Sequence, residues 1–156
     1  MTRDNTSGIK IIAVNKKVRR HFEIMESIEA GISLTGSEVK SMRAGQISFK
    51  DGYVKFQNNE AFLADVHIAP YENAGYAQHE PERLRKLLLH KREINRLMGK
   101  VEQKGLTVVP LKAYFKNGRI KIELALARGL KLFDQRESLK QRAVKRDTDR
   151  EMAMHK

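Results

Sequence analysis

The feature that most limits what this chain can fold into is an Asn-Gly pair between two alternating apolar runs. Within residues 106–127, apolar side chains occupy every second position on both sides of Asn117-Gly118. Both central positions of a type I′ turn need a positive φ, which Asn and Gly tolerate. The pattern therefore predicts an antiparallel hairpin, with Pro110 on an edge strand or at a bulge.

Other segments carry weaker signals of regular structure. They are a second hairpin with strands 53–56 and 61–68, a long strand 22–34 with a bulge or bend at Gly31, a short helix 35–45 and a long helix 81–104. The long helix is predicted because Pro81 suits a first helical turn and apolar residues recur three and four positions apart after it. Short strands, tight hairpins and few helices predict a mainly β fold with flanking helices: a closed, oligonucleotide-binding-like β-barrel with about three helices.

Composition narrows the class of protein. The 156 residues, 40% hydrophobic and 32% charged, fit one globular domain. The chain has no cysteine, which excludes disulfides, thiolate zinc sites and thiol nucleophiles. No apolar run approaches the roughly 20 residues of a membrane helix, and residues 1–8 lack the apolar region of a signal peptide, so we expect a cytoplasmic protein without membrane contact. A formal net charge of +12 favours a polyanionic partner.

The positive charge belongs to the body of the chain. Residues 134–156 hold seven basic and five acidic side chains, a net of +2, which leaves +10 for the rest. This segment follows the last aromatic residue, Phe133, and is too polar to bury a core, so it is predicted to be disordered alone and helical on a partner. A solvated tail without a role is the alternative. We expect a flexible N-terminus over residues 1–8, an RNA-binding barrel over 9–133 and a C-terminal tail over 134–156.

Catalytic chemistry finds little support. The five histidines are scattered, without the i, i+4 spacing of a helical metal site, and no phosphate-binding glycine loop occurs. Glu29 and Glu38 are not marked locally as an acid–base pair, so no catalytic residue, metal or cofactor is predicted. Basic residues on predicted elements favour RNA. Asn15 suits the N-cap of a basic turn that includes Lys16. Arg119 and Lys121 line the last hairpin near the aromatic residues Tyr114 and Phe115, a combination that suits RNA contacts. Each patch alone has the alternative of being solvated surface.

A series of sequence blocks carries a family resemblance. The blocks are residues 13–17, 29–32, 34–45, 51–54, 67–71, 85–89, 105–111 and 114–121. In order and spacing, from about residue 9 to Glu137, they resemble the small protein B family, whose members bind transfer-messenger RNA (tmRNA, or SsrA) in trans-translation. The resemblance implies an oligonucleotide-binding-like barrel that grips the tRNA-like domain of tmRNA.

The resemblance also implies an RNA-binding set. With their cationic neighbours, the matching residues are Asn15, Lys16, Glu29, Glu38, Lys40, Arg43, Leu88, Arg119 and Lys121. Lys40 and Lys121 are expected to meet phosphates, and Asn15 a base or sugar edge. Glu29 and Glu38 are expected to orient a neighbouring Arg or Lys, or to accept from a base or a 2′-OH. Leu88 is expected to pack either in the core or against an exposed base.

For the tail, the resemblance implies entry into the ribosome near the small-subunit decoding centre and along the empty mRNA channel. Gln135 and Leu130 stand where the family usually has lysine, so each departure removes one positive charge. The predicted ribosome-binding residues are Lys131, Asp134, Gln135, Arg136, Lys140 and Arg142.

The resemblance therefore predicts a non-enzymatic adaptor that brings tmRNA to stalled ribosomes. It implies alanyl-tRNA synthetase and elongation factor Tu as functional partners, and nothing in the sequence demands more than a monomer. A small RNA-processing enzyme on the same barrel and a general single-strand RNA chaperone are the alternatives.

Overall fold

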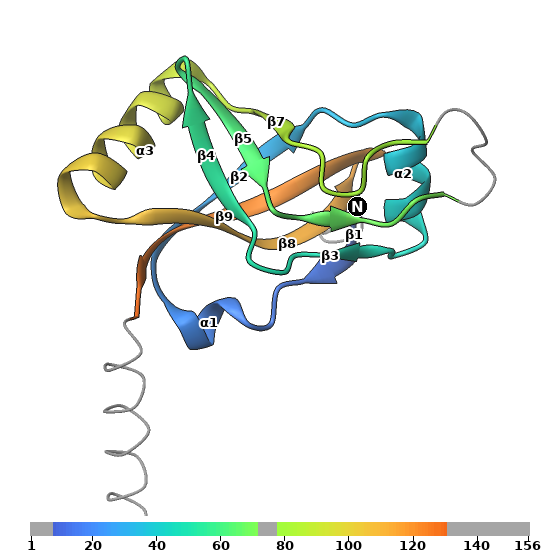
Figure 1. Cartoon of the computed structure of the whole chain (residues 1–156), viewed down its shortest axis with the longest axis horizontal. Coiled ribbons are helices and arrows are strands. Elements are labelled where there is room, and N and C mark those ends of the chain that lie inside the picture. Colours follow the sequence, from blue (N-terminus) through green and yellow to red (C-terminus); the bar gives the residue numbers. More distant parts are fainter. Residues whose placement is uncertain (1–7, 72–77, 131–156) are drawn as a thin grey trace, which may run out of the picture.

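The computed structural model describes residues 8–71 and 78–130, which form a mainly β protein with three helices (Figure 1). The strands are β1 Ile9–Val14, β2 Phe22–Ile32, β3 Ile47–Ser48, β4 Tyr53–Gln57, β5 Glu60–Ala64, β6 His67–Ile68, β7 Arg85–Leu88, β8 Thr107–Lys116 and β9 Arg119–Gly129. The helices are α1 Val18–His21, α2 Gly36–Arg43 and α3 Lys91–Lys104.

Seven strands make one antiparallel sheet in the order β1-β8-β9-β2-β7-β5-β4, and β3 pairs with β6. The mainly β fold with three helices is as predicted, but the closed barrel is not confirmed. Within the described part of the chain, β1 and β4 are the two edges of the seven-stranded ladder. β4 comes back against β8 through contacts rather than through ladder hydrogen bonds, so the sheet curves without closing.

Both predicted hairpins form. Asn117 and Gly118, with φ of 53° and 78°, join β8 to β9, as a two-residue primed turn requires. Asn58 and Asn59 adopt the same left-handed region between β4 and β5. The strand predicted to continue to residue 68 is wrong, because Asp65 has a φ of 58° and separates β5 from β6.

The irregular positions of the long strands are partly as predicted. The β8–β9 register shifts between Pro110 and Lys112, so the proline lies at a bulge, on a strand that has β1 and β9 on its two sides. Of the bulge or bend predicted at Gly31, the bulge is wrong, because the β2–β9 register shifts between Ile24 and Glu26 instead. Gly31 pairs with Leu88 and Lys121 in regular register.

The long helix predicted over residues 81–104 is wrong in its first half. Residues 85–88 form strand β7, and α3 begins only at Lys91. In β7, Arg85 and Leu87 point inward and are at most 1% exposed, whereas Leu88 points outward and is 56% exposed. The strand alternation was hidden because a charged residue fills an inward position and a leucine fills an outward one.

Strand β9 divides the two faces of the sheet. Its even-numbered residues from 120 to 126 lie in the main core. Of its odd-numbered residues, Ala125 and Ala127 pack with Val18 of α1 in a second apolar cluster on the other face. The remaining odd-numbered side chains are Arg119, Lys121 and Glu123. This end of the face therefore keeps charged groups at the surface, beside the hairpin turn.

Candidate nucleic-acid interface

Helix α2 begins with a reciprocal capping box. The Thr35 hydroxyl accepts a hydrogen bond from the Glu38 backbone N–H at 3.4 Å, and the Glu38 carboxylate accepts one from the Thr35 N–H at 2.8 Å. The Ser/Thr-x-x-Glu spacing of the sequence provides both halves of this motif. The carboxylate is thereby turned back over the start of the helix, toward β7.

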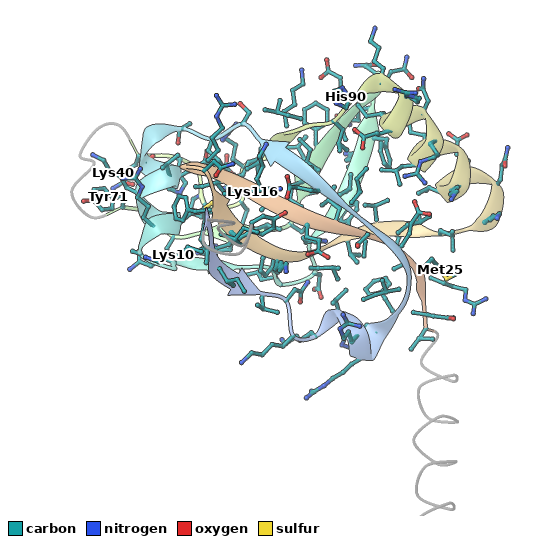
Figure 2. All side chains as sticks on the ribbon, turned by 180° about the vertical axis from the view of Figure 1, so that it is seen from behind. Lys10, Met25, Lys40, Tyr71, His90 and Lys116 are labelled. Carbon is teal, nitrogen blue, oxygen red and sulfur yellow. The ribbon has the colours of Figure 1, made fainter. Side chains whose placement is uncertain are left out.

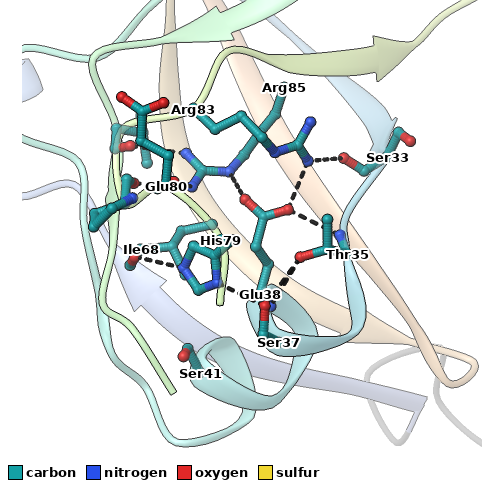
Figure 3. Close-up of polar contacts among 12 residues, drawn as sticks. Ser33, Thr35, Ser37, Glu38, Ser41, Ile68, His79, Glu80, Arg83 and Arg85 are labelled. Atoms are coloured by element: carbon teal, nitrogen blue, oxygen red, sulfur yellow. Dashed lines mark hydrogen bonds and ion pairs between the residues drawn. The ribbon is translucent and has the colours of Figure 1, made fainter. Parts of the chain in front are cut away.

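Two arginines complete the surroundings of this carboxylate (Figure 3). Arg83 Nη2 lies 2.6 Å from Glu38 Oε1, and Arg85 Nε donates to Glu38 Oε2. The side chains of Glu38 and Arg85 are 0% exposed. Burial alone raises the pKa of the Glu38 carboxyl, but hydrogen bonds from Arg83, the Thr35 N–H and Arg85 outweigh it and hold this pKa at about 2.

The remaining donors of Arg85 connect this pair to the chain on both sides of residues 72–77. Its guanidinium donates to the carbonyls of Val66 and Pro81, each at 2.9 Å. Nearby, His79 bridges Ser37 of α2 and the Ile68 carbonyl through its two ring nitrogens, both at 2.8 Å. The network therefore fixes α2 against β6 and β7.

The fixed helix presents two cations at its last turn, each over an aromatic ring. Lys40 Nζ lies 5.4 Å from the centre of the Tyr71 ring, and the Arg43 guanidinium lies 5.9 Å from that of Phe115. Figure 2 shows Lys40 and Tyr71 together at the α2 end of the molecule, with Lys10 of β1 at the same end. The negative face of each ring attracts the cation above it and so favours these positions of the two side chains.

Beside this helix lies a hollow of about 270 Å³, at the end of the sheet next to the β8–β9 turn. Gly31, Leu88 and Lys121 line one part of it, and Phe115 and Arg119 line another. A Cβ on Gly31 would lie 3.2 Å from Leu88 Cβ and 3.6 Å from Lys121 Nζ, so the glycine keeps this space open. Leu88 is 56% exposed, so the alternative of core packing is wrong for this residue.

Glu29 is partly exposed and contacts a phenol and a cation. Tyr114 donates its hydroxyl proton to the carboxylate, and Lys116 Nζ lies 3.2 Å from it. The hydrogen bond from Tyr114 is the main reason why the pKa of Glu29 is lowered. Burial and the Glu29 charge raise the pKa of Tyr114, so this phenol stays protonated. Glu29 thus holds Lys116 at the surface beside the hollow.

Asn15 and Lys16 lie elsewhere. They follow the far end of β1, where they line a different hollow with Ser48 and Lys50. The Asn15 side chain donates to the Pro110 carbonyl at 2.9 Å, and the N-cap of α1 is Lys17, so the predicted capping role of Asn15 is wrong. The structure therefore gathers one part of the predicted RNA-binding set and leaves another apart.

The gathered residues are Glu29, Lys40, Arg43, Leu88, Arg119 and Lys121, with Glu38 buried in the first turn of α2. The tail residues Lys131, Asp134, Gln135, Arg136, Lys140 and Arg142 lie outside the described residues.

Sequence reasoning missed three participants in this surface. They are Lys10, Gly31 in its space-keeping role and Tyr71. Phe115 was expected near the hairpin cations as an aromatic that suits RNA contacts, although its alternation also pointed to the core. Tyr71 and Lys10 carried no signal, since their neighbours come from distant parts of the sequence.

Residues 8–71 and 78–130 contain no group of three or more His, Asp or Glu side chains placed to hold a metal ion. In the same ranges, no helix is long and apolar enough to cross a membrane.

The curved sheet, the ion-paired helix and the hollow lined by Arg119 and Lys121 define a small β protein with a cationic surface between α2 and the β8–β9 turn. Its relatives give the family. The family model described as SmpB protein matches residues 12–154, so the chain belongs to the SmpB family. The SsrA-binding protein of Solidesulfovibrio magneticus is 66% identical over 149 residues, with 96% of this chain and 97% of the relative covered.

More distant relatives and a solved structure agree. The SsrA-binding proteins of Oleidesulfovibrio alaskensis and Nostoc punctiforme are 59% and 53% identical, and the alignments cover 99% and 96% of this chain and 100% and 97% of the relatives. A structure described as "tmRNA-SmpB: a journey to the center of the bacterial ribosome" is 50% identical with a TM-score of 0.67. The match covers 81% of this chain and 93% of that one.

The buried carboxylate predicts a specific pH dependence of stability. Because the pKa of Glu38 is lowered from 4.5 to about 2 in the folded state, its contribution is present above pH 4.5 and is lost as the pH falls toward 2. Glu38→Gln should lower the free energy of unfolding at pH 7 by about 3 kcal/mol, since Arg85 is left buried without its counter-charge. Urea unfolding at pH 7, 4 and 2.5 should show that the difference in unfolding free energy between wild type and variant becomes smaller as the pH falls.

Glu60→Gln is the matched control, because Glu60 pairs with Lys86 at 3.6 Å with both side chains about half exposed. It should change stability little at any pH. A deficit for Glu38→Gln that is small at pH 7, or that stays constant down to pH 2.5, would contradict this account of the buried pair.

Proposed function

We propose that this chain is a non-enzymatic RNA-binding adaptor of trans-translation. In this role it binds the tRNA-like domain of tmRNA and brings it to stalled ribosomes. Relatives at 53–66% identity over almost the whole chain are named for SsrA binding, and a structure of similar fold is described with tmRNA and the ribosome. The observation that carries the proposal is the cationic hollow between α2 and the β8–β9 turn.

Each gathered residue has a role that its surroundings favour. Lys121 and Arg119, at the rim of the hollow, meet phosphates, and Leu88 offers an apolar surface to a base. Arg43 and Lys40 add charge from α2. Glu38 acts indirectly, because its buried carboxylate positions α2 and Arg83 rather than touching RNA. Glu29 likewise acts through Lys116.

The tail has a separate role in this proposal. Lys131 and the residues from Asp134 onward enter the small-subunit decoding centre and the empty mRNA channel, where the segment becomes helical and reports that mRNA is missing. Alanyl-tRNA synthetase and elongation factor Tu act on the same RNA, and the protein works in the cytoplasm as a monomer. The near-balanced charge of residues 134–156, net +2, supports a distinct contact for the tail.

Lys121→Gln should weaken binding to the tRNA-like domain about tenfold at 0.1 M salt. It should also lower the slope of log affinity against log salt concentration by about one, because one counterion fewer is released per complex. Fluorescence anisotropy over a salt series measures both quantities. Lys55→Gln is the control, since Lys55 is an exposed cation on β4 that does not line this hollow.

Equal losses for Lys55→Gln and Lys121→Gln would mean that net charge, and not this surface, drives binding. The same assay separates the alternatives: a general single-strand chaperone binds unstructured RNA as tightly as the tRNA-like domain, and a processing enzyme turns RNA over.

A chain truncated before Asp134 should bind the tRNA-like domain with unchanged affinity but fail to support tagging. The folded body that carries the hollow is intact in this variant, whereas the proposed ribosome contact is removed. Anisotropy and a reconstituted tagging reaction on ribosomes without a codon in the A site measure the two activities. Loss of RNA binding by the truncated chain would contradict the separation of roles.

A further inference from the structure

The cationic hollow has a neighbour on the other side of Phe115. A second hollow of about 270 Å³ is lined by Lys10, Arg43, Phe115 and Gly118, and the first is also lined by Phe115 and Gly118. Phe115 thus forms a wall shared by two hollows that open next to the same turn. None of the roles assigned above uses this ring.

The ring is held in a fixed position. Phe115 lies on β8 between two paired neighbours, Lys10 of β1 and Ile120 of β9, and packs against the main core. It is nevertheless only half-buried. The Arg43 guanidinium lies 5.9 Å from its centre. An aromatic ring fixed at a surface stacks on a ligand with little loss of entropy.

Two glycines, Gly31 and Gly118, line the first hollow together with the ring. Gly118, with a φ of 78°, belongs to the turn, and a Cβ built on it would meet nothing within 4 Å. Gly31 leaves the floor of the first hollow empty, where a Cβ would lie against Leu88. Two glycines in the lining of the hollow that Phe115 shares leave room there for a flat group.

The charge around the two hollows has one sign. Four cations line them: Lys10, Arg43, Arg119 and Lys121. Among the described residues that line either hollow, none is acidic. A flat apolar wall with a cationic rim is complementary to a nucleotide, whose base stacks and whose phosphates are anionic. A base pair inside a stem is already stacked on both faces, so only an unpaired base has a free face that can stack on the ring.

We propose that Phe115 contacts RNA directly, by packing against an unpaired base while the cations of the two hollows hold the flanking phosphates. This rests on the proposed RNA-binding function and adds to it the kind of nucleotide that is recognised. The surface therefore selects an RNA loop with at least one unstacked base. The RNA-contacting surface extends from Lys121 across Phe115 to Lys10 of β1.

The absence of tryptophan from the chain permits a direct test. Phe115→Trp introduces a single indole at the wall between the hollows. Its emission should be quenched when a tRNA-like hairpin with an open loop is added to the full-length protein. It should stay unchanged with the same hairpin after its loop is annealed to a complementary strand. Quenching by both RNAs alike, or by neither, would overturn the proposal.

Affinity gives a second readout. Phe115→Leu keeps the apolar packing but removes the aromatic face, and should weaken binding to the open-loop hairpin about 5- to 100-fold. It should leave the weaker binding to the annealed hairpin unchanged, and Phe115→Trp should bind the open loop as well as wild type does. Tyr53→Leu is the matched control, because Tyr53 is a 36% exposed aromatic on β4 that lines neither of these hollows.

The two proposals fail in different ways. If the wild-type chain bound neither hairpin, the proposed function would be wrong. If it bound the open loop and Lys121→Gln weakened that binding, but Phe115→Leu bound normally and the indole emission did not change, only the Phe115 contact would be wrong.

Discussion

A buried ion pair holds together the parts that form the candidate interface. It joins Glu38 of α2 to Arg85 of β7. Each charge alone is costly to bury, and the pair persists because Arg83, the Thr35 N–H and backbone carbonyls satisfy the remaining hydrogen-bonding groups. The pair fixes α2 against the sheet. Lys40 and Arg43 therefore reach the surface from a helix that cannot shift without breaking a buried ionic network.

The sheet determines which part of the surface next to α2 stays open. β9 presents alanines where α1 packs and charged side chains where the face is open, so one strand carries a packing region and a polar region in sequence. The open region ends at the Asn117-Gly118 turn, which is narrow and leaves the adjacent hollows accessible. The interface thus arises where a tight turn, an uncovered sheet face and the C-terminal end of α2 meet.

Features set by local chemistry were predictable from the sequence, and features set by distant partners were not. The hairpin at Asn117-Gly118 and helix α2 follow from backbone preferences of a few neighbouring residues. Strand β7 was missed because Arg85 reads as exposed until its partner Glu38, 47 residues away in sequence, is known. Residue types and motif blocks pointed to Lys121 and Arg43. For Glu38 the family resemblance left two roles open, orienting a neighbouring cation or accepting from RNA, and the structure buries its carboxylate against Arg83 and Arg85.

The claim at the centre of this account is that one structured RNA, and not RNA in general, fits the surface between α2 and the β8–β9 turn. Crosslinking the protein to RNA in living cells, purifying it under denaturing conditions and sequencing the attached RNA tests this most directly. The account predicts strong enrichment of an RNA with a tRNA-like domain, with crosslinks in its unpaired loops. Recovery of mixed messenger fragments in proportion to their abundance would contradict it.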